Sequence, residues 1–370
     1  MTTLLVTGGA GFIGANFVHF WLARHPADSI VVLDALTYAG NLANLLPARD
    51  NPRFTFAHGD IRTPRLAETL LREHAVSVVV HLAAESHVDR SIAGPDPFLE
   101  TNVAGTHVLL KAARQVWLEE GKGGSHPRFH QVSSDEVYGS LEPDDPPFTE
   151  ESPYRPSSPY AASKAAADHL VRAYWRTYGL PMTITNCSNN YGPWQFPEKL
   201  IPLAITHALD GKPIPIYGDG RQIRDWLHVQ DHCRAIEAVL DRGVVGETYN
   251  VGGETERTNA ETVRLLARQL DGAFAADPAL SRRFAQSPAA QGKTAELITH
   301  VVDRAGHDRR YAISNEKIRQ ELGFRWEVGL ERGVQQTLAW YLENEPWWRQ
   351  VMDGTYREWI RAQYGPIVSF

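Results

Sequence analysis

The stretch Thr7-Gly8-Gly9-Ala10-Gly11-Phe12-Ile13-Gly14 decides the fold class of this chain. It follows a short apolar run, Leu4-Leu5-Val6, and precedes a helical pattern that continues to about His25. A strand, a glycine turn and a helix in this order let the backbone approach a pyrophosphate and point the helix amino terminus at its charge. We therefore predict a dinucleotide-binding βαβ unit, in which the cofactor contacts Gly8, Gly11, Phe12, Ile13 and Gly14.

Asp34 ends the second apolar run, Val31-Val32-Leu33, and indicates which dinucleotide is bound. A carboxylate at this point can accept hydrogen bonds from an adenosine ribose. The next three residues, Ala35, Leu36 and Thr37, offer no cation for a 2′-phosphate, so the sequence favours NAD over NADP. Asp34 alone could be a helix cap, but its βαβ context favours the cofactor site.

The alternation of strands and helices continues and predicts an α/β fold with a doubly wound, Rossmann-type parallel sheet. Further strands are expected at 54–57, 78–82, 129–132 and 182–185, with a long helix from about 97 to 119. We expect an NAD-binding domain with the catalytic residues over 1–190, to which the chain returns at 225–250. A smaller, mixed α/β substrate-binding domain is expected over 191–370. Ligands lie beyond the carboxyl ends of such strands. The residues that follow the third and fourth strands are therefore expected to line the cofactor groove: Asp60, Ile61, Leu82, Ala83, Ala84, Glu85, Ser86 and His87.

Three proton-handling side chains, Asp135, Glu136 and Tyr160, lie close together in the sequence, and Lys164 follows the tyrosine by one helical turn. Residues four apart share a helix face, so Lys164 is expected beside Tyr160. A phenol has a pKa of about 10, so its pKa must fall by roughly three units for it to act as a base at neutral pH. This fall requires that the phenolate be stabilised by about 4 kcal/mol. One ammonium at about 4 Å, at an effective dielectric of ~20, supplies a Coulomb energy of about that size. The pattern predicts a tyrosine base, although Tyr-x-x-x-Lys alone also fits an ordinary surface helix.

Composition narrows the class of protein. The chain has 370 residues, 43% of them hydrophobic, which is enough for a large core. Its two cysteines, Cys187 and Cys233, cannot form a disulfide framework and belong to no metal-ligand cluster, so a reducing, cytoplasmic location without a structural metal is expected. No apolar run of about 18 residues and no targeting signal are visible. The net charge of −7 argues against a nucleic-acid partner.

The later part of the chain is less regular. Residues 193–224 are rich in proline, glycine and aromatic residues and are interpreted as loops and short elements over a substrate, with Arg224 placed to meet a phosphate. The charged run 303–311 fits either a ligand loop or a solvated turn. Residues 271–297 have no assigned element, and a surface insertion is one interpretation. Helices are expected at 315–322 and 330–343, followed by an aromatic helix from Trp347-Trp348 through Trp359.

Together these residues resemble the extended short-chain dehydrogenase/reductase superfamily of NAD-dependent epimerases and dehydratases, and most closely its dTDP-glucose 4,6-dehydratases. The most specific motifs are His87-Val88-Asp89-Arg90-Ser91, Ser134-Asp135-Glu136-Val137-Tyr138-Gly139, Asn189-Asn190-Tyr191-Gly192-Pro193, Glu198-Lys199-Leu200-Ile201-Pro202 and the run 303–311. Related epimerases share the nucleotide site and Tyr-x-x-x-Lys, but the resemblance implies no Asp-Glu pair in them. The family commonly has threonine where this chain has Ser134, which keeps the hydroxyl and lacks the methyl group.

The resemblance implies a nucleotide-sugar substrate and a role for each site residue. Tyr160 would take the 4-hydroxyl proton, with Ser134 orienting that hydroxyl, and Lys164 beside the phenolate. Glu136 would be the base at carbon 5 and Asp135 the acid for the leaving 6-hydroxyl. The resemblance also places Thr101 and Asn190 at the cofactor, and at the nucleotide sugar Ser86, His87, Ser134, Asn189, Lys199, Leu200, Pro215, Tyr217, Arg224, Asn259, Asp303 and His307.

Several alternatives stay open at this point. His87 could be a surface histidine, and Thr101 and Asn102 could simply be solvated. An epimerase or decarboxylase on the same scaffold and a non-catalytic dinucleotide-sensing regulator are rival functions, and the base could be UDP, CDP or GDP. The family pairs two helices across a two-fold axis as a four-helix bundle, so a homodimer is expected through apolar residues of the helices near 97 and 159: Val108, Leu109, Ala113, Ala166, Leu170 and Ala173.

Overall fold

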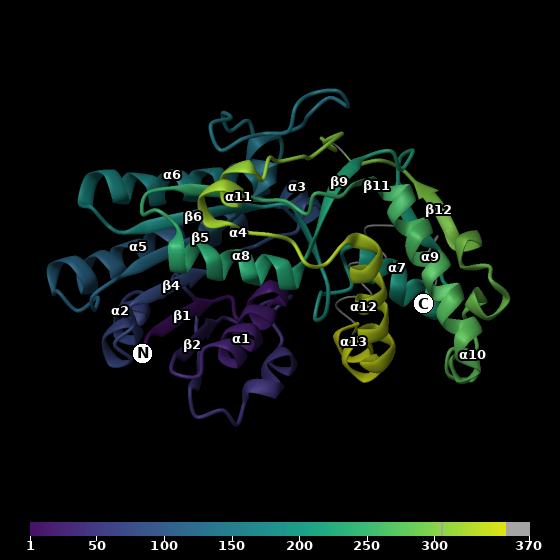
Figure 1. The fold of residues 1–370 in the computed structure, drawn as a ribbon, viewed down its shortest axis with the longest axis horizontal. Helices are drawn as coiled ribbons and strands as arrows, with labels where there is room; N and C mark the ends of the chain where they lie inside the picture. Colours follow the sequence, from purple (N-terminus) through teal and green to yellow (C-terminus); the bar gives the residue numbers. More distant parts are fainter. Residues whose placement is uncertain (305, 353–370) are drawn as a thin grey trace.

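The computed structural model describes residues 1–304 and 306–352, and it is built around a seven-stranded sheet (Figure 1). The strand order is β10-β6-β5-β4-β1-β2-β3, and all pairs are parallel. The predicted doubly wound sheet is confirmed. The strands are β1 (Thr3–Thr7), β2 (Ser29–Asp34), β3 (Phe54–His58), β4 (Val78–His81), β5 (Arg128–Ser134), β6 (Met182–Cys187) and β10 (Thr248–Val251).

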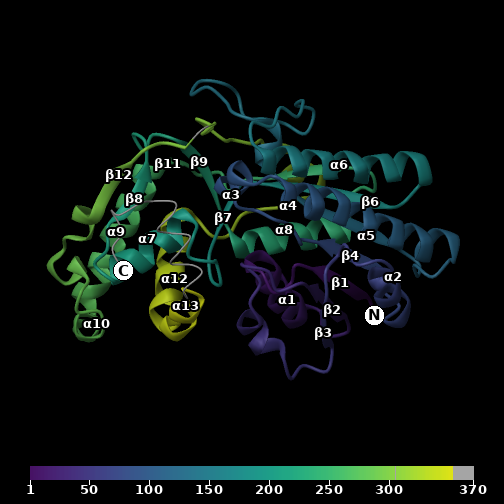
Figure 2. The ribbon, with the colours of Figure 1, turned by 180° about the vertical axis from the view of Figure 1, so that it is seen from behind.

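Both faces of the sheet are covered by helices, which explains why its strands are apolar on both sides. Leu5 packs under one layer and Leu4 and Val6 pack under the other, and all three are fully buried. One layer contains α1 (Phe12–Arg24) and α8 (Val229–Arg242); the other contains α2 (Leu66–Glu73), α5 (Thr106–Ala113) and α6 (Pro159–Tyr178). Figure 2 shows α5 and α6 in front of the sheet.

The long helix predicted from about 97 to 119 is confirmed, with two π-helical stretches in it. It consists of α4 (Asp96–Phe98), η2 (Leu99–Gly105), α5 and η3 (Arg114–Glu119) in unbroken succession. Short helices α3 (Val88–Ala93), η1 (Leu42–Ala48) and η4 (Asp135–Tyr138) follow three of the strands and bring their first residues to the carboxyl edge of the sheet.

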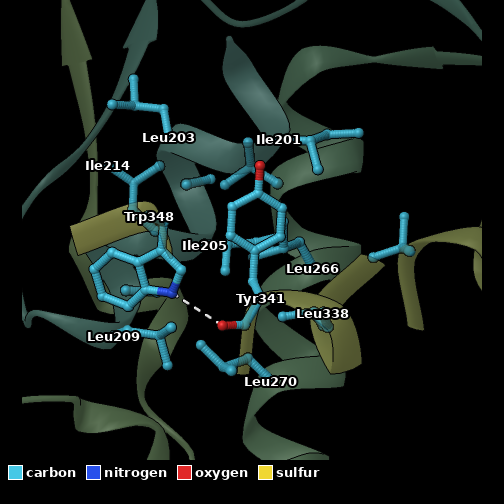
Figure 3. Close-up of a cluster of buried hydrophobic side chains, with 14 of the residues drawn as sticks. Ile201, Leu203, Ile205, Leu209, Ile214, Leu266, Leu270, Leu338, Tyr341 and Trp348 are labelled. Atoms are coloured by element: carbon cyan, nitrogen blue, oxygen red, sulfur yellow. Dashed lines mark hydrogen bonds between the residues drawn. The ribbon is translucent and has the colours of Figure 1, made fainter. Parts of the chain in front are cut away.

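A second group of elements packs beside this edge and has its own hydrophobic core, here called the second core. Figure 3 shows the fully buried Tyr341 and Trp348 at its centre, where the indole N–H of Trp348 donates to the carbonyl of Tyr341 at 2.9 Å. The elements are β7 (Asn189–Tyr191), β9 (Ile223–His228) and β11 (Glu256–Thr258) in one sheet, the pair β8 (Ile214–Tyr217) and β12 (Ile298–Val301), and the helices α7 (Leu200–Leu209), α9 (Asn259–Ala276), α12 (Leu330–Glu343) and α13 (Glu345–Val351). Helix α11 (Glu316–Leu322) packs instead on β10 and α8 beside the large sheet.

The expectation of loops and short elements over 193–224 was wrong in one respect. Residues Leu200–Leu209 form a ten-residue helix, α7, in which every residue after Leu200 is buried. A helix that is apolar on all sides shows no amphipathic period, so its sequence resembles a buried strand or an irregular segment.

Residues 271–297 are part of the second core, so the interpretation as a surface insertion was wrong. They complete α9 and then form α10 (Pro278–Arg283), η5 (Pro288–Gln291) and η6 (Thr294–Leu297). The two prolines start helices, where a missing N–H costs nothing. Leu280, Phe284 and Ala289 are at least 91% buried against the second core.

The carboxyl-terminal helices are confirmed at 316–322 and 330–343. Trp347 and Trp348 lie on α13 and are buried in the second core, as expected of an aromatic helix packed on the body. The remainder of that prediction, to Trp359, lies outside the described residues. Across residues 1–304 and 306–352, no helix is both long enough and apolar enough to span a bilayer.

Candidate active site

A cavity of about 620 Å³ lies between the carboxyl edge of the sheet and the second core. It is lined from both sides, which brings together residues far apart in the sequence. The predicted site residues that line it are Gly8, Gly11, Phe12, Ile13, Gly14, Asp34, Ala35, Thr37, Asp60, Ile61, Leu82, Ala83, Ala84, Glu85, Ser86, His87, Thr101, Ser134, Asp135, Glu136, Tyr160, Lys164, Asn189, Asn190, Lys199, Leu200, Pro215, Tyr217, Arg224, Asn259 and His307.

Two predicted site residues, Leu36 and Asp303, do not line the cavity. Leu36 turns its side chain into the core beside the sheet and offers its N–H to the Asp34 carboxylate at 2.8 Å. Asp303 accepts hydrogen bonds from Gln222 at 2.9 Å and from the ring of His307 at 2.5 Å. It therefore acts on the cavity through His307, which does line it.

The glycine turn forms a cradle that only glycine can make. A Cβ on Gly8, at φ +71°, would lie 2.6 Å from the backbone nitrogen of Ala83, and one on Gly14 would collide with the carbonyl of Gly8. Helix α1 begins at Phe12 without a side-chain cap, so its first N–H groups are left for a ligand in the cavity. This geometry fits the pyrophosphate of a dinucleotide.

Asp34 is buried at the end of β2, and both its carboxylate oxygens accept backbone N–H groups. Ala10 donates to one at 2.9 Å and Leu36 to the other at 2.8 Å. Burial raises the pKa of Asp34, and these two hydrogen bonds oppose the shift. Arg62 also lines the cavity, but it is paired with Asp60 at 2.7 Å and Glu100 at 2.5 Å.

The catalytic candidates come from two neighbouring elements. Ser134 ends β5, and Asp135 and Glu136 begin η4; the hydroxyl of Ser134 accepts the N–H of Glu136 at 3.2 Å. Tyr160 and Lys164 lie on the first turns of α6, which packs against both β5 and η4. The Lys164 ammonium donates to the carbonyl of Val132 at 2.7 Å, and the alternative of an ordinary surface helix is wrong because both side chains are more than 90% buried.

The expected lowering of the Tyr160 pKa by Lys164 is not observed in the protein alone. Burial raises the pKa of Tyr160 well above its ordinary value, the carboxylate of Glu136 adds to the shift, and a hydrogen bond with Ser134 opposes it. Burial also lowers the pKa of Lys164, against the charge of Asp168. The low dielectric that strengthens the pair also disfavours each of its charges, and for the phenolate the second effect is larger.

The two adjacent carboxyls differ in their surroundings. Burial, followed by the charges of Glu136 and Asp225, raises the pKa of Asp135 well above its ordinary value. Burial also raises the pKa of Glu136, but the cations Arg304, Lys199 and Arg224 counteract the shift. Both pKa values are raised, and the cations limit the rise at Glu136, so the surroundings separate the two carboxyls in the direction that a paired acid and base need.

The alternatives for His87 and Asn102 are resolved by burial. His87 is 4% exposed, so it is not a surface histidine; burial, followed by the cations Lys199, Arg90 and Arg304, lowers its pKa well below the ordinary value. Asn102 is 2% exposed, so solvation is excluded for it as well. Its amide exchanges two hydrogen bonds of 2.9 Å with the backbone of Glu85, which fixes the loop that follows β4.

Cations gather on the side of the cavity made by the second core. Arg224 is 5% exposed and lies over the ring of Tyr311 at 4.3 Å, while its nitrogens donate to the carbonyls of Ile223 and Asp308. Lys199 donates to the carbonyl of Ser86 at 3.0 Å. These cations suit an anionic group such as a diphosphate.

Comparisons with known proteins agree with this geometry. The family model described as GDP-mannose 4,6-dehydratase matches residues 5–337. The chain belongs to this family.

Within the GDP-mannose 4,6-dehydratase family, the chain is similar to curated enzymes named dTDP-glucose 4,6-dehydratase. One from Escherichia coli is 50% identical over 95% of this chain and 97% of its own, and one from Xanthomonas campestris is 52% identical over 96% and 98%. The crystal structure of dTDP-glucose 4,6-dehydratase from Streptomyces venezuelae with NAD bound matches with a TM-score of 0.83 and 48% identity, over 95% of this chain and 100% of that one. A UDP-glucose 4-epimerase from Thermotoga maritima matches with a TM-score of 0.77 and 26% identity, over 93% and 100%.

Several cavity residues of this family member were missed by sequence reasoning. The ligand-loop interpretation of the charged run holds, because the predicted His307 lines the cavity together with Arg304, and Tyr311 of the same run lines it without having been assigned to the site. Tyr38 and Glu198 also line it, and the guanidinium of Arg90 lies 3.9 Å over the Tyr38 ring. Glu198 stood in a quoted motif, so its signal was visible, whereas nothing in the sequence around Tyr38 marks it as a site residue.

Proposed function

We propose that this protein dehydrates dTDP-glucose to dTDP-4-keto-6-deoxyglucose with NAD as an internally recycled cofactor, and is therefore a hydro-lyase. The observation that carries the proposal is the Asp135–Glu136 pair, which lines the same cavity as Tyr160 and Lys164. The similarity to named dTDP-glucose 4,6-dehydratases over nearly the whole chain supports it. The reaction of an epimerase and the binding function of a dinucleotide sensor do not require an acid–base pair at this position.

We assign the cofactor to the glycine cradle, the uncapped start of α1 and the carboxylate of Asp34. Bound NAD would supply the hydride acceptor for sugar carbon 4 and the hydride donor for carbon 6. In the protein alone, the hydrogen bond with Ser134 opposes the burial that raises the pKa of Tyr160.

The chain's own groups then divide the proton transfers. Tyr160 takes the proton of the 4-hydroxyl, which Ser134 orients. The 4-keto group acidifies carbon 5, and Glu136 takes the proton there. Asp135 gives its proton to the 6-hydroxyl, which leaves as water. Glu136 returns a proton to carbon 5 after hydride reaches carbon 6. Tyr160 then releases its proton to solvent and Asp135 takes one up, so the cycle is redox-neutral, restores all three groups and releases one water.

The nucleotide sugar would be held by the second-core side of the cavity. We assign its diphosphate to Arg224, with Lys199 nearby, and the rest to Ser86, His87, Asn189, Leu200, Pro215, Tyr217, Asn259 and His307. In this division residues 1–190 serve mainly the cofactor and the chemistry, and residues 191–370 mainly the nucleotide sugar. The cytoplasm is the expected location of such an enzyme.

We also propose a homodimer in which α5 and α6 of two chains pair as a four-helix bundle. Of the six residues expected there, Leu109 and Ala113 are 2% and 0% exposed inside one chain, so they were wrongly assigned. Ala173 is exposed and Val108, Ala166 and Leu170 are half-buried, so these four are the candidates.

Product analysis tests the function directly. Purified protein is incubated with dTDP-, UDP-, CDP- and GDP-glucose and GDP-mannose, and the products are weighed by mass spectrometry. Loss of one water from dTDP-glucose is expected. Loss from GDP-mannose alone would favour the second candidate, the reaction that the family description names, and loss from none would exclude a dehydratase.

A further inference from the structure

We propose that Asp168 is a positioning residue whose buried carboxylate keeps Lys164 in its ammonium form beside Tyr160. The inference rests on the proposed function, because it concerns the base in that reaction. Asp168 follows Lys164 by one turn of α6, and it is fully buried. It is not among the described residues that line the cavity, so it acts through Lys164 rather than on a ligand.

The hydrogen bonds around Asp168 favour its ionised form. Its Oδ2 atom accepts the hydroxyl of Ser133 at 2.6 Å and that of Tyr154 at 3.2 Å. The Tyr154 oxygen itself accepts from Arg172 at 2.9 Å and Asn186 at 3.1 Å, so its one proton is left for Asp168. Oδ1 has no hydrogen-bond partner among the described residues, so the hydrogen bonds that stabilise the charge all reach Oδ2.

Lys164 needs a nearby anion because its surroundings otherwise disfavour a charge. The ammonium is buried, and its one hydrogen-bond acceptor among the described residues is the carbonyl of Val132. The titratable groups that face it are Tyr160 and Asp168 on α6, Cys187 on β6 and His81 on β4.

Of these four groups, Asp168 is the source of negative charge. Burial raises its pKa, and the charge of Lys164, followed by the hydrogen bond from Ser133, opposes that shift, so the two charges support each other. Burial raises the pKa of Cys187 to about 12, and the pKa of Tyr160 is also raised, so both are neutral. Burial lowers the pKa of His81 to about 3, so it is neutral too. Burial lowers the pKa of Lys164, and Asp168 opposes that shift. Loss of the Asp168 charge therefore lets Lys164 lose its proton at a lower pH.

The test is the pH profile of kcat/KM for dTDP-glucose in Asp168→Asn. The rate should fall on the alkaline side as Lys164 deprotonates, and this limb should move to lower pH by about one unit or more in the variant. The acid limb should stay in place. We compare kcat/KM of Asp168→Asn with that of the unaltered protein at two pH values. The reduction in the variant should be about tenfold greater at the alkaline end of the unaltered protein's plateau than at neutral pH.

Four further variants separate charge from structure. Asp168→Glu keeps the charge and should restore the alkaline limb, and Asp168→Ser is a second neutral variant should the Asn protein not fold. Tyr154→Phe removes a hydrogen bond to Asp168 and leaves its charge. Asp231→Asn removes an equally buried carboxylate, on α8, that pairs with Arg234 at 2.7 Å. Neither control should move the alkaline limb.

The outcomes are distinct. A rate loss in both neutral variants that is the same at every pH, or an alkaline limb that Asp231→Asn moves as far, would overturn the role of Asp168. If the unaltered protein does not dehydrate dTDP-glucose, the proposed function fails instead.

Discussion

Asp135 and Glu136 show how consecutive residues of the same chemical type acquire different electrostatic surroundings. Both are buried carboxyls, yet the pKa of Asp135 is raised by Glu136 and Asp225, whereas three cations oppose the rise at Glu136. Removing either carboxyl should therefore stop the reaction at the same stage for a different reason.

Glu136→Gln keeps the size of the side chain and removes the base at carbon 5. Oxidation at carbon 4 should proceed and elimination should fall by about 10²–10⁴-fold, so reduced cofactor should accumulate on the enzyme. Single-turnover absorbance of NADH, with deuterium incorporation at carbon 5, measures both steps.

Two companion variants complete that experiment. Asp135→Asn should also accumulate NADH, but exchange of the carbon 5 proton should persist because Glu136 is intact. Tyr160→Phe should show neither signal. Elimination at the unaltered rate in Glu136→Gln, or proton exchange as fast as in Asp135→Asn, would show that another group is the base.

Asp34→Ala should weaken retention of NAD and narrow the preference over NADP, because the carboxylate that would repel a 2′-phosphate is gone. Asp34 also accepts the N–H groups of Ala10 and Leu36, so the glycine turn loses two supports. Asp34→Asn is the matched control, because it keeps one acceptor oxygen and removes the charge. Calorimetric titration with NAD and with NADP gives the ratio of the two affinities. Tight copurification of NADP with the unaltered protein would contradict the assignment of NAD as the cofactor.

Glu198 should make the stability of the protein depend on pH. Burial raises its pKa from 4.5 to about 7, with Lys199 and Arg90 opposing the shift. A carboxyl with a raised pKa in the folded state stabilises the fold below its unfolded pKa, and this contribution is lost as the pH rises through about 7. Relative to Glu198→Gln, the protein should lose about 3 kcal/mol of unfolding free energy between pH 4 and pH 8. Urea unfolding at both pH values measures it, and a constant difference would refute it.

At the scale of elements, the sequence predicted what local pattern determines. Strands β1 to β6, α1, α6, α11 and α12 were predicted, because their apolar runs or helical periods are bounded by glycine, proline or polar residues. For β10, only the return of the chain to this domain was expected. Helix α7 and residues 271–297 were not, because their apolar residues are matched by a core built from distant segments. The same reason hid Tyr38, whose place in the cavity depends on segments that are distant in the sequence.

Phe284→Ala tests whether 271–297 belongs to the core. Phe284 is 3% exposed and its ring centroid lies 6.3 Å from that of Phe274. The substitution should lower the free energy of unfolding by about 3–5 kcal/mol through lost burial and a residual cavity. Arg282→Ala, at an exposed position of α10, should change it by less than about 0.5 kcal/mol. Equal, small changes in the free energy of unfolding for both variants would show that residues 271–297 are not part of the core.

At the scale of the whole molecule, two cores face each other across one cavity. The sheet supplies the glycine cradle, the acid pair and Tyr160, and the second core supplies Lys199, Arg224 and His307. The backbone joins the two sides at the acidic loop before α6, where Leu141 donates to Arg310 at 3.0 Å and Phe148 to Ala312 at 2.9 Å. Substrate contacts on one side are thereby fixed relative to reacting groups on the other.

The proposed pairing of α5 and α6 predicts a solution mass of twice 41.3 kDa. Ala173→Glu places a charge on the exposed side of α6 and should shift the mass toward the monomer in sedimentation equilibrium. Leu46→Glu, at a 57% exposed residue of η1, is the control and should leave the mass unchanged. A mass of one chain at every concentration would remove the proposal.

The position of β10 at the edge of the sheet has a consequence for biosynthesis. Its neighbour β6 ends at Cys187, and β10 begins at Thr248, after β7, α7, β8, β9 and α8 have been made. At about 5–20 residues added per second, β6 waits roughly 3–12 seconds on the ribosome for its partner strand. During that time its unpaired N–H and C=O groups form an open sheet edge, which is a template for pairing with other chains. A holdase chaperone that protects the nascent polypeptide would therefore find its target at β6, before translation has reached residue 251.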